Sequence, residues 1–159
     1  MDIARVKEYL GAEWTAVQEC ISGSLESDID LLNQTNKSIL SHSGKQLRPI
    51  LALLTARACS ADGCASEATV RYAAAAELMH NATLLHDDVA DDSDQRRGMP
   101  TIRSLMGPTV SVLLGDYWLV KAMDLILGSH DADSQVIRIF SKTLSDLAEG
   151  ELLQLLYAV

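Results

Sequence analysis

Residues 66–101 read SEATVRYAAAAELMHNATLLHDDVADDSDQRRGMPT, and this stretch decides the fold. Between Gly63 and Gly98 the chain has neither Gly nor Pro, and from Ser66 onward the residues are strong helix formers. The stretch therefore predicts a single helix of about six or seven turns, the longest element of the chain. Five aspartates crowd toward the C-terminal end of this helix, where the helix dipole is already negative.

Helical periodicity continues on both sides of this stretch. It predicts a first helix from Ile3 to about Gly23 and a second that starts at Ser24 as its N-cap and ends near Leu40. A third helix covers Ile50 to Cys59, with Pro49 in its first turn. After the break at Gly98, Met99 and Pro100, we expect helices over residues 101–106, 108–127 and from about Asp133 onward. No useful period-2 run predicts a strand, so the fold class is all-α.

Composition agrees with one soluble helical domain. The 159 residues are 48% hydrophobic but only 4% aromatic, which favours helix over strand. A net charge of −9 disfavours binding to nucleic acid. Cys20, Cys59 and Cys64 form an odd set without CxxC spacing, and the N-terminus lacks the apolar run of a signal peptide, so we expect a cytoplasmic protein. Three charged residues interrupt the most apolar stretch, 110–127, which excludes it as a membrane span.

The acidic run suggests a metal site. Asp87 and Asp91 are four residues apart, so their carboxylates project from one helix face at a spacing that suits Mg²⁺. Asp88, Asp92 and Asp94 complete the run, and a solvated acidic helix end is the plain alternative. An EF-hand is excluded because a loop that starts at Asp92 would have arginines at its sixth and twelfth positions in place of Gly and Glu.

Cationic residues accompany the acidic run. Arg96 and Arg97 follow it directly, and Lys45 and Arg48 lie in a separate loop before the helix that begins near Pro49. Carboxylates for a metal together with Arg and Lys suggest a diphosphate ligand. The alternative for the two arginines is that they simply neutralise the neighbouring aspartates.

Four segments carry a family resemblance. LLHDDVADDSDQRRGMPT (residues 84–101) resembles the first aspartate-rich motif of the all-trans isoprenyl diphosphate synthases, and GKQLRP (residues 44–49) resembles the isopentenyl diphosphate loop of that family. GDYW (residues 115–118) and AEGELLQL (residues 148–155) are similar to later family segments in the same order. The resemblance is greatest to the long-chain polyprenyl diphosphate synthases, and it implies the N-terminal half of a large helical bundle.

The resemblance implies roles for individual residues. Asp87 and Asp91 would bind the Mg²⁺ ions that hold an allylic diphosphate, with support from Asp88, and Arg96 would bind that diphosphate directly. The implied ligands of isopentenyl diphosphate are Lys45, Arg48, His80 and Arg97. The implied reaction ionises the allylic diphosphate and joins it to the isopentenyl double bond without a side-chain nucleophile, which fits the lack of a Ser/His/Asp or Cys/His constellation here.

One feature of the family is missing from the sequence. Family members are about twice as long and carry a second aspartate-rich motif, which nothing after Asp146 supplies. We therefore expect residues 1–159 to be a single helical domain, an N-terminal fragment with little or no activity alone, and the family resemblance implies a homodimer. The rival hypothesis is a non-catalytic helical subunit that keeps the first motif and serves a partner protein.

The resemblance also suggests a long product. From Asp87 the hydrocarbon tail would pass Thr83, Met79 and Ala76, one and more turns earlier on the helix. Ala82 and Thr83 stand where short-chain family members carry bulky aromatics, so the tunnel is open and a long polyprenyl chain, such as a quinone side chain, is expected. Met123 is either a deeper floor of this tunnel or ordinary core. A long apolar product would allow peripheral contact with a membrane.

Overall fold

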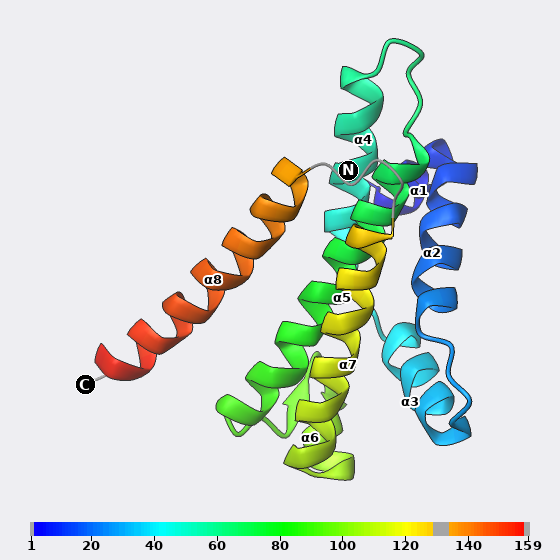
Figure 1. The fold of residues 1–159 in the computed structure, drawn as a ribbon. Coiled ribbons are helices and arrows are strands. Elements are labelled where there is room, and N and C mark those ends of the chain that lie inside the picture. The colour runs from blue at the N-terminus through cyan, green and yellow to red at the C-terminus, as the bar shows by residue number, and fades with distance from the viewer. Residues whose placement is uncertain (1, 129–133, 158–159) are drawn as a thin grey trace.

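The computed structural model describes residues 2–128 and 134–157, and in this part of the chain it contains eight helices and one short strand pair (Figure 1). The fold class is all-α, as the sequence predicts. In chain order the elements are α1 (Ile3–Leu10), α2 (Ala12–Ser24), α3 (Asp30–Ser41), α4 (Leu47–Cys59), α5 (Glu67–Ala90), β1 (Gln95–Arg96), β2 (Met99–Pro100), α6 (Ile102–Met106), α7 (Pro108–Leu127) and α8 (Ser134–Tyr157).

Helix α5 is the central element of the bundle. It packs most extensively against α7, which lies beside it in Figure 1, and also against α4 and α2. Ala73, Ala74, Ala75 and Ala82 are buried along α5, and their small side chains let the neighbouring helices approach closely. The predicted length of this helix is confirmed, and Ser66 caps it by accepting a hydrogen bond from the backbone N–H of Thr69.

The predicted first helix is wrong in one respect, because the structure divides it at Gly11. This glycine has a φ of 54°, and its N–H closes α1 by donating to the carbonyl of Lys7. The prediction that Ser24 is an N-cap is also wrong. Ser24 is the last residue of α2 and donates its hydroxyl to the carbonyl of Ile21, while α3 starts only at Asp30.

The structure also contains a hairpin that the sequence did not predict. Helix α5 ends at Ala90, and β1 and β2 then pair antiparallel with Arg96 opposite Met99. Arg97 and Gly98 form the turn with φ angles of 53° and 77°, the backbone of a two-residue type I′ turn. Strands of two residues are too short to produce a period-2 pattern. The helices predicted over residues 101–106 and 108–127 are confirmed to within one residue at each end.

Helix α8 extends away from the bundle (Figure 1). It is described from Ser134, and the predicted start at Asp133 lies outside the described residues. Its contacts with the bundle come from one side only, and large apolar side chains remain exposed near its C-terminal end. None of the helices in the described part of the chain has the length and apolarity that crossing a membrane would require.

Candidate functional site

The five aspartates after the middle of α5 differ in their partners. Asp88 is buried and accepts a hydrogen bond from Nε of Arg96 at 2.9 Å, and Nη2 of Arg96 lies 2.8 Å from the same carboxylate oxygen in an ion pair. Arg103 of α6 pairs with both Asp92 and Asp94. Among the described residues, Asp87 and Asp91 form no ion pair. The two carboxylates that the sequence placed on one helix face are therefore the two of the five that form no ion pair with a described residue.

The environment of Asp87 favours a cation. Burial raises the pKa of Asp87, and the nearby carboxylates of Glu151 and Asp91 raise it further, against the opposing effect of Arg96. Within the described residues no three His, Cys, Asp or Glu side chains are arranged to hold a metal ion by themselves. Mg²⁺ commonly takes only one or two carboxylates and completes its shell with water and substrate phosphate. Asp87 and Asp91 therefore fit a Mg²⁺ ion that a diphosphate ligand shares.

A cationic hollow of about 420 Å³ lies beside the N-terminal end of α4 and the middle of α5. We define it by its lining residues, which are Gly44, Lys45, Gln46, Leu47, Arg48, Glu77, His80, Asn81 and Arg97. The structure thus brings together Lys45, Arg48, His80 and Arg97, which come from three separate segments of the sequence. Burial and the charges of Arg48, Arg97 and Arg96 lower the pKa of His80 to about 4, so this imidazole is neutral near pH 7.

Two apolar hollows follow α5 on the side that faces α8. The Asp87 hollow, about 370 Å³, is lined by Ala82, Thr83, His86, Asp87, Leu119, Leu144, Leu147, Ala148 and Glu151. The Met79 hollow, about 270 Å³, is lined by Arg48, Ala76, Met79, His80, Thr83, Ile139, Phe140, Thr143 and Leu147. Thr83 and Leu147 line both, and Arg48 with His80 joins the second to the cationic hollow. The predicted tail path along Thr83, Met79 and Ala76 therefore runs past neighbouring hollows.

Met123 lies apart from this path. It packs against the hydrophobic core on α7 and is not among the described residues that line the two apolar hollows. Its suggested role as a deeper floor stays a prediction. Leu119 stands one turn before Met123 and does line the Asp87 hollow, together with residues of α8. Sequence reasoning missed these wall residues because a leucine on an apolar helix gives no signal of its own.

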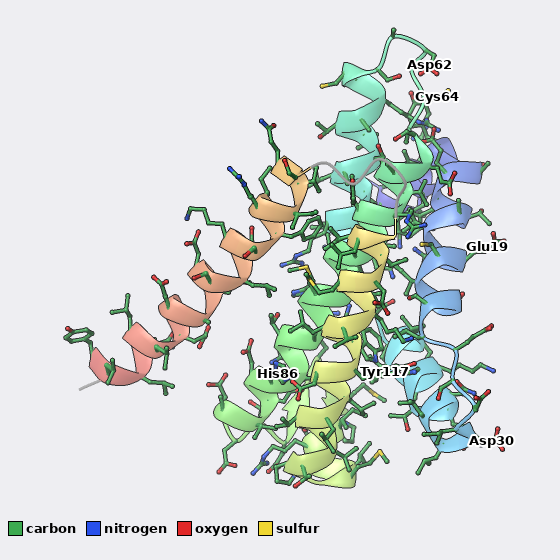
Figure 2. The ribbon with its side chains drawn as sticks, in the orientation of Figure 1. Glu19, Asp30, Asp62, Cys64, His86 and Tyr117 are labelled. Carbon is green, nitrogen blue, oxygen red and sulfur yellow. The ribbon has the colours of Figure 1, made fainter. Side chains whose placement is uncertain are left out.

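Sequence reasoning also did not single out His86 or its contacts with α7. The Nε2 atom of His86 lies 3.1 Å from Asp116 Oδ1 and 3.3 Å from the carbonyl oxygen of Val112. A Cβ at Gly115 would lie 2.5 Å from Cδ2 of His86, so only glycine leaves room for the ring. Figure 2 shows His86 where α5 and α7 run side by side. The GDYW segment was a signal for this contact, since it contains both Gly115 and Asp116.

Comparison with known proteins gives the same family throughout. The model of the polyprenyl synthetase family matches residues 29–159. The chain is 39% identical over 158 residues to octaprenyl diphosphate synthase from Escherichia coli (strain K12), and this match covers 98% of the chain and 47% of that enzyme. The chain thus spans about half the length of the curated relatives that it matches.

Solved structures show the same architecture. A decaprenyl diphosphate synthase from Rhodobacter capsulatus superposes with a TM-score of 0.88 at 35% identity, over 97% of this chain and 46% of that one. A polyprenyl synthase from Caulobacter crescentus CB15, solved with calcium and isoprenyl diphosphate, gives 0.87 at 32% identity, over 97% and 45%. One neighbour is named as a decaprenyl diphosphate synthase and the other as a polyprenyl synthase. In each of them the matched part is a little under half of the chain.

Proposed function

The chain belongs to the polyprenyl synthetase family, and we propose that it forms the first half of a Mg²⁺-dependent site that condenses isopentenyl diphosphate with an allylic diphosphate. One observation carries this proposal: two carboxylates without an ion pair among the described residues, a cationic hollow and two neighbouring apolar hollows all lie along α5. An allylic diphosphate has a matching division into an anionic head and an apolar tail. The relative solved with a divalent cation and an isoprenyl diphosphate supports the same ligand class.

The allylic diphosphate would be held at the end of α5. Asp87 and Asp91 would hold Mg²⁺ there, and bound Mg²⁺ neutralises negative charge on a diphosphate leaving group. Arg96 would bind the diphosphate directly, because its Nε and Nη2 atoms are fixed by the buried Asp88. Asp88 would thus support the site by orienting an arginine.

Isopentenyl diphosphate would occupy the cationic hollow. Lys45, Arg48 and Arg97 offer positive charge, and the neutral His80 offers one N–H without adding charge. The allylic C–O bond breaks with its electron pair leaving on the diphosphate. The isopentenyl double bond then forms the new C–C bond, and the departed diphosphate accepts the proton that is lost. No side-chain nucleophile is required for these steps.

The product would be a long-chain all-trans polyprenyl diphosphate of the kind used for quinone side chains. Thr83 and Leu147 line both the Asp87 hollow and the Met79 hollow, and small residues such as Ala82 would let the tail pass from the first to the second. A chain of this length is strongly apolar, and we place the protein in the cytoplasm with peripheral contact to a membrane. A homodimer is part of the proposal, by analogy with the family.

A chimera provides the test. This chain, followed by the second half of octaprenyl diphosphate synthase from Escherichia coli, is incubated with farnesyl diphosphate, labelled isopentenyl diphosphate and Mg²⁺. We expect labelled long-chain product from the chimera and little or none from the chain alone. Asp87→Asn should lower the rate at least ~100-fold, because it removes a metal ligand. Asp94→Asn is the matched control, since Asp94 is already paired with Arg103, and it should change the rate much less.

Two outcomes would contradict the proposal. Equal losses from Asp87→Asn and Asp94→Asn would mean that the Asp87 carboxylate has no special role. A chimera that folds but forms no product, while the chain alone binds a protein partner, would favour the rival reading as a non-catalytic helical subunit.

A further inference from the structure

The loop before α4 and the β1–β2 turn meet where Gly44 faces the side chain of Arg97. A Cβ atom built on Gly44 would overlap Nη1 of Arg97 and lie 2.7 Å from its Cζ and 2.9 Å from its Nη2. These separations are far below van der Waals contact, so the guanidinium rests directly on the α-carbon of Gly44. The contact joins two segments that are more than fifty positions apart in the sequence.

The backbone at this point is unfavourable for the residues it carries. Arg97 has a φ of 53°, and Gln46, two residues after Gly44, has a φ of 55°. The first position of a type I′ turn normally carries Asn, Asp or Gly, because other side chains are disfavoured at positive φ. Strain of this kind persists where the surrounding structure has a use for it. The turn itself does not favour arginine at position 97. The presence of arginine there is better explained by a role of its guanidinium at the cationic hollow.

Arg97 lies at the border of two hollows. One is the cationic hollow, and the other, about 290 Å³, lies between α3, α5 and α6 and includes Asp88 and Arg96 in its lining. Arg97 and Asn81 line both hollows. Arg97 forms no ion pair with any described residue, so no carboxylate fixes the guanidinium at close range. Gly44 is a close contact of this guanidinium.

We infer that Gly44 is a positioning residue for Arg97: its missing side chain provides the seat that keeps the guanidinium at the wall of the cationic hollow. The inference rests on the proposed function, in which Arg97 binds the diphosphate of isopentenyl diphosphate. The seat explains why the GKQLRP loop has glycine next to Lys45 although no positive φ is recorded there. The guanidinium is the far end of a flexible side chain, so an alanine at position 44 would displace Arg97 and leave the fold intact.

The test measures binding of isopentenyl diphosphate to the 159-residue chain by calorimetry, with thermal unfolding recorded in parallel. Gly44→Ala should weaken binding about tenfold, the usual effect of losing one charge-assisted hydrogen bond, with little change in the melting temperature. Gly23→Ala is the matched control, because a Cβ there meets nothing within 4 Å and its φ is not positive. This control should leave binding unchanged.

A double-mutant cycle separates positioning from a general effect on the loop. Arg97→Ala should weaken binding at least as much as Gly44→Ala, and Gly44→Ala should have no further effect in the Arg97→Ala background, since its Cβ then meets no guanidinium. A loss that persists in that background would overturn the positioning role. So would normal binding by Gly44→Ala when Arg97→Ala binds weakly, although the proposed function would then survive. Failure of the parent chain to bind isopentenyl diphosphate, or unchanged binding by Arg97→Ala, would count against both the positioning role of Gly44 and the proposed function.

Discussion

Glu77 is a buried carboxylic acid that the proposed reaction does not use. Only 4% of its surface is exposed, and its Oε2 atom has no hydrogen-bond partner among the described residues. Its Oε1 atom lies 3.4 Å from the amide nitrogen of Asn81. Burial raises the pKa of Glu77, and Asn81, Arg48 and Arg97 oppose this shift only in part. The group lines the cationic hollow from one turn before His80, where its negative charge partly balances the surrounding cations.

We predict that Glu77→Gln makes the chain more stable at pH 7, by about 1 kcal/mol, because an isosteric neutral group avoids the desolvation of a carboxylate. The pH dependence has a definite sign. A folded-state pKa above the unfolded value gives stability that is present at low pH and lost as pH rises through the folded pKa. The advantage of Glu77→Gln should therefore shrink as pH falls toward 4. Urea unfolding of the parent chain and of Glu77→Gln at several pH values measures this advantage. A difference in the free energy of unfolding that stays constant across pH would contradict the prediction.

Thr83 is positioned to control product length. It is half-buried and lines both apolar hollows, one turn before Asp87. In the chimera described above, Thr83→Phe should shorten the polyprenyl product, since the ring would fill the passage between the hollows. Ala82→Phe should act in the same direction, but Ala82 is fully buried, and overpacking would cost about 1–3 kcal/mol of stability. Thr109→Phe, at an exposed position on α7, is the control, and products of equal length from all three variants would exclude this path.

At the scale of whole elements, the sequence predicted helices where local signals were complete. Helix α7 has Pro108 in its first turn and Gly128 just after its end, and its bounds agree with the prediction. Ser66 and Thr101 both cap helices through their hydroxyls. The break at Gly11 was missed because apolar spacing continues across it, and the hairpin was missed because two-residue strands have no period. The candidate site followed the same rule, since charged motifs singled out Asp87 and Arg97, which line hollows in the structure, whereas nothing local marked the other lining residues Leu119 and Leu147.

The α2–α3 connection shows what long-range contacts add. Asn36 is buried, donates its amide to the carbonyl of Leu25 at 3.1 Å, and accepts a hydrogen bond from Nε1 of Trp118 at 2.9 Å. Tyr117 donates its hydroxyl to the same Leu25 carbonyl. These bonds fix α3 against α7 across more than eighty positions of sequence. A local pattern could not have predicted how α3 lies against α7, because the Trp118 and Tyr117 contacts come from a helix far away in the sequence.

We predict that Asn36→Ala destabilises the chain by about 2–3 kcal/mol, because it removes both hydrogen bonds and leaves a buried indole N–H without its acceptor. Gln34→Ala, at an exposed position of the same helix, should change the free energy of unfolding by less than about 0.5 kcal/mol. Urea denaturation followed by the fluorescence of the two tryptophans measures both effects. Equal values for the two variants would show that the Asn36 contacts do not hold α3 in place.

At the scale of the whole molecule, α8 is notable for the large apolar side chains that it exposes near its C-terminal end. Its bundle side closes the two apolar hollows through Leu144 and Leu147. Leu152 and Leu156 lie one turn apart near its C-terminal end, with 57% and 75% of their surfaces exposed. Leu153, Leu155 and Tyr157 are also exposed, so the exposed apolar side chains are clustered here and are not scattered singly over the surface. In the relatives that match this chain, about half of each protein lies outside the matched region.

We therefore predict that the 159-residue chain self-associates as its concentration rises, because pairing of these surfaces removes apolar area from water. Replacing Leu152 and Leu156 with lysine should shift the chain toward monomer without unfolding it, since both positions are exposed and helix C-termini favour positive charge. Adding two lysines at Ser141 and Gln154, exposed polar positions of the same helix, controls for the change in net charge. Sedimentation velocity over a range of concentrations distinguishes the cases. A parent chain that stays monomeric at the highest concentration, or a lysine variant that associates as strongly as the control, would mean that another surface governs assembly.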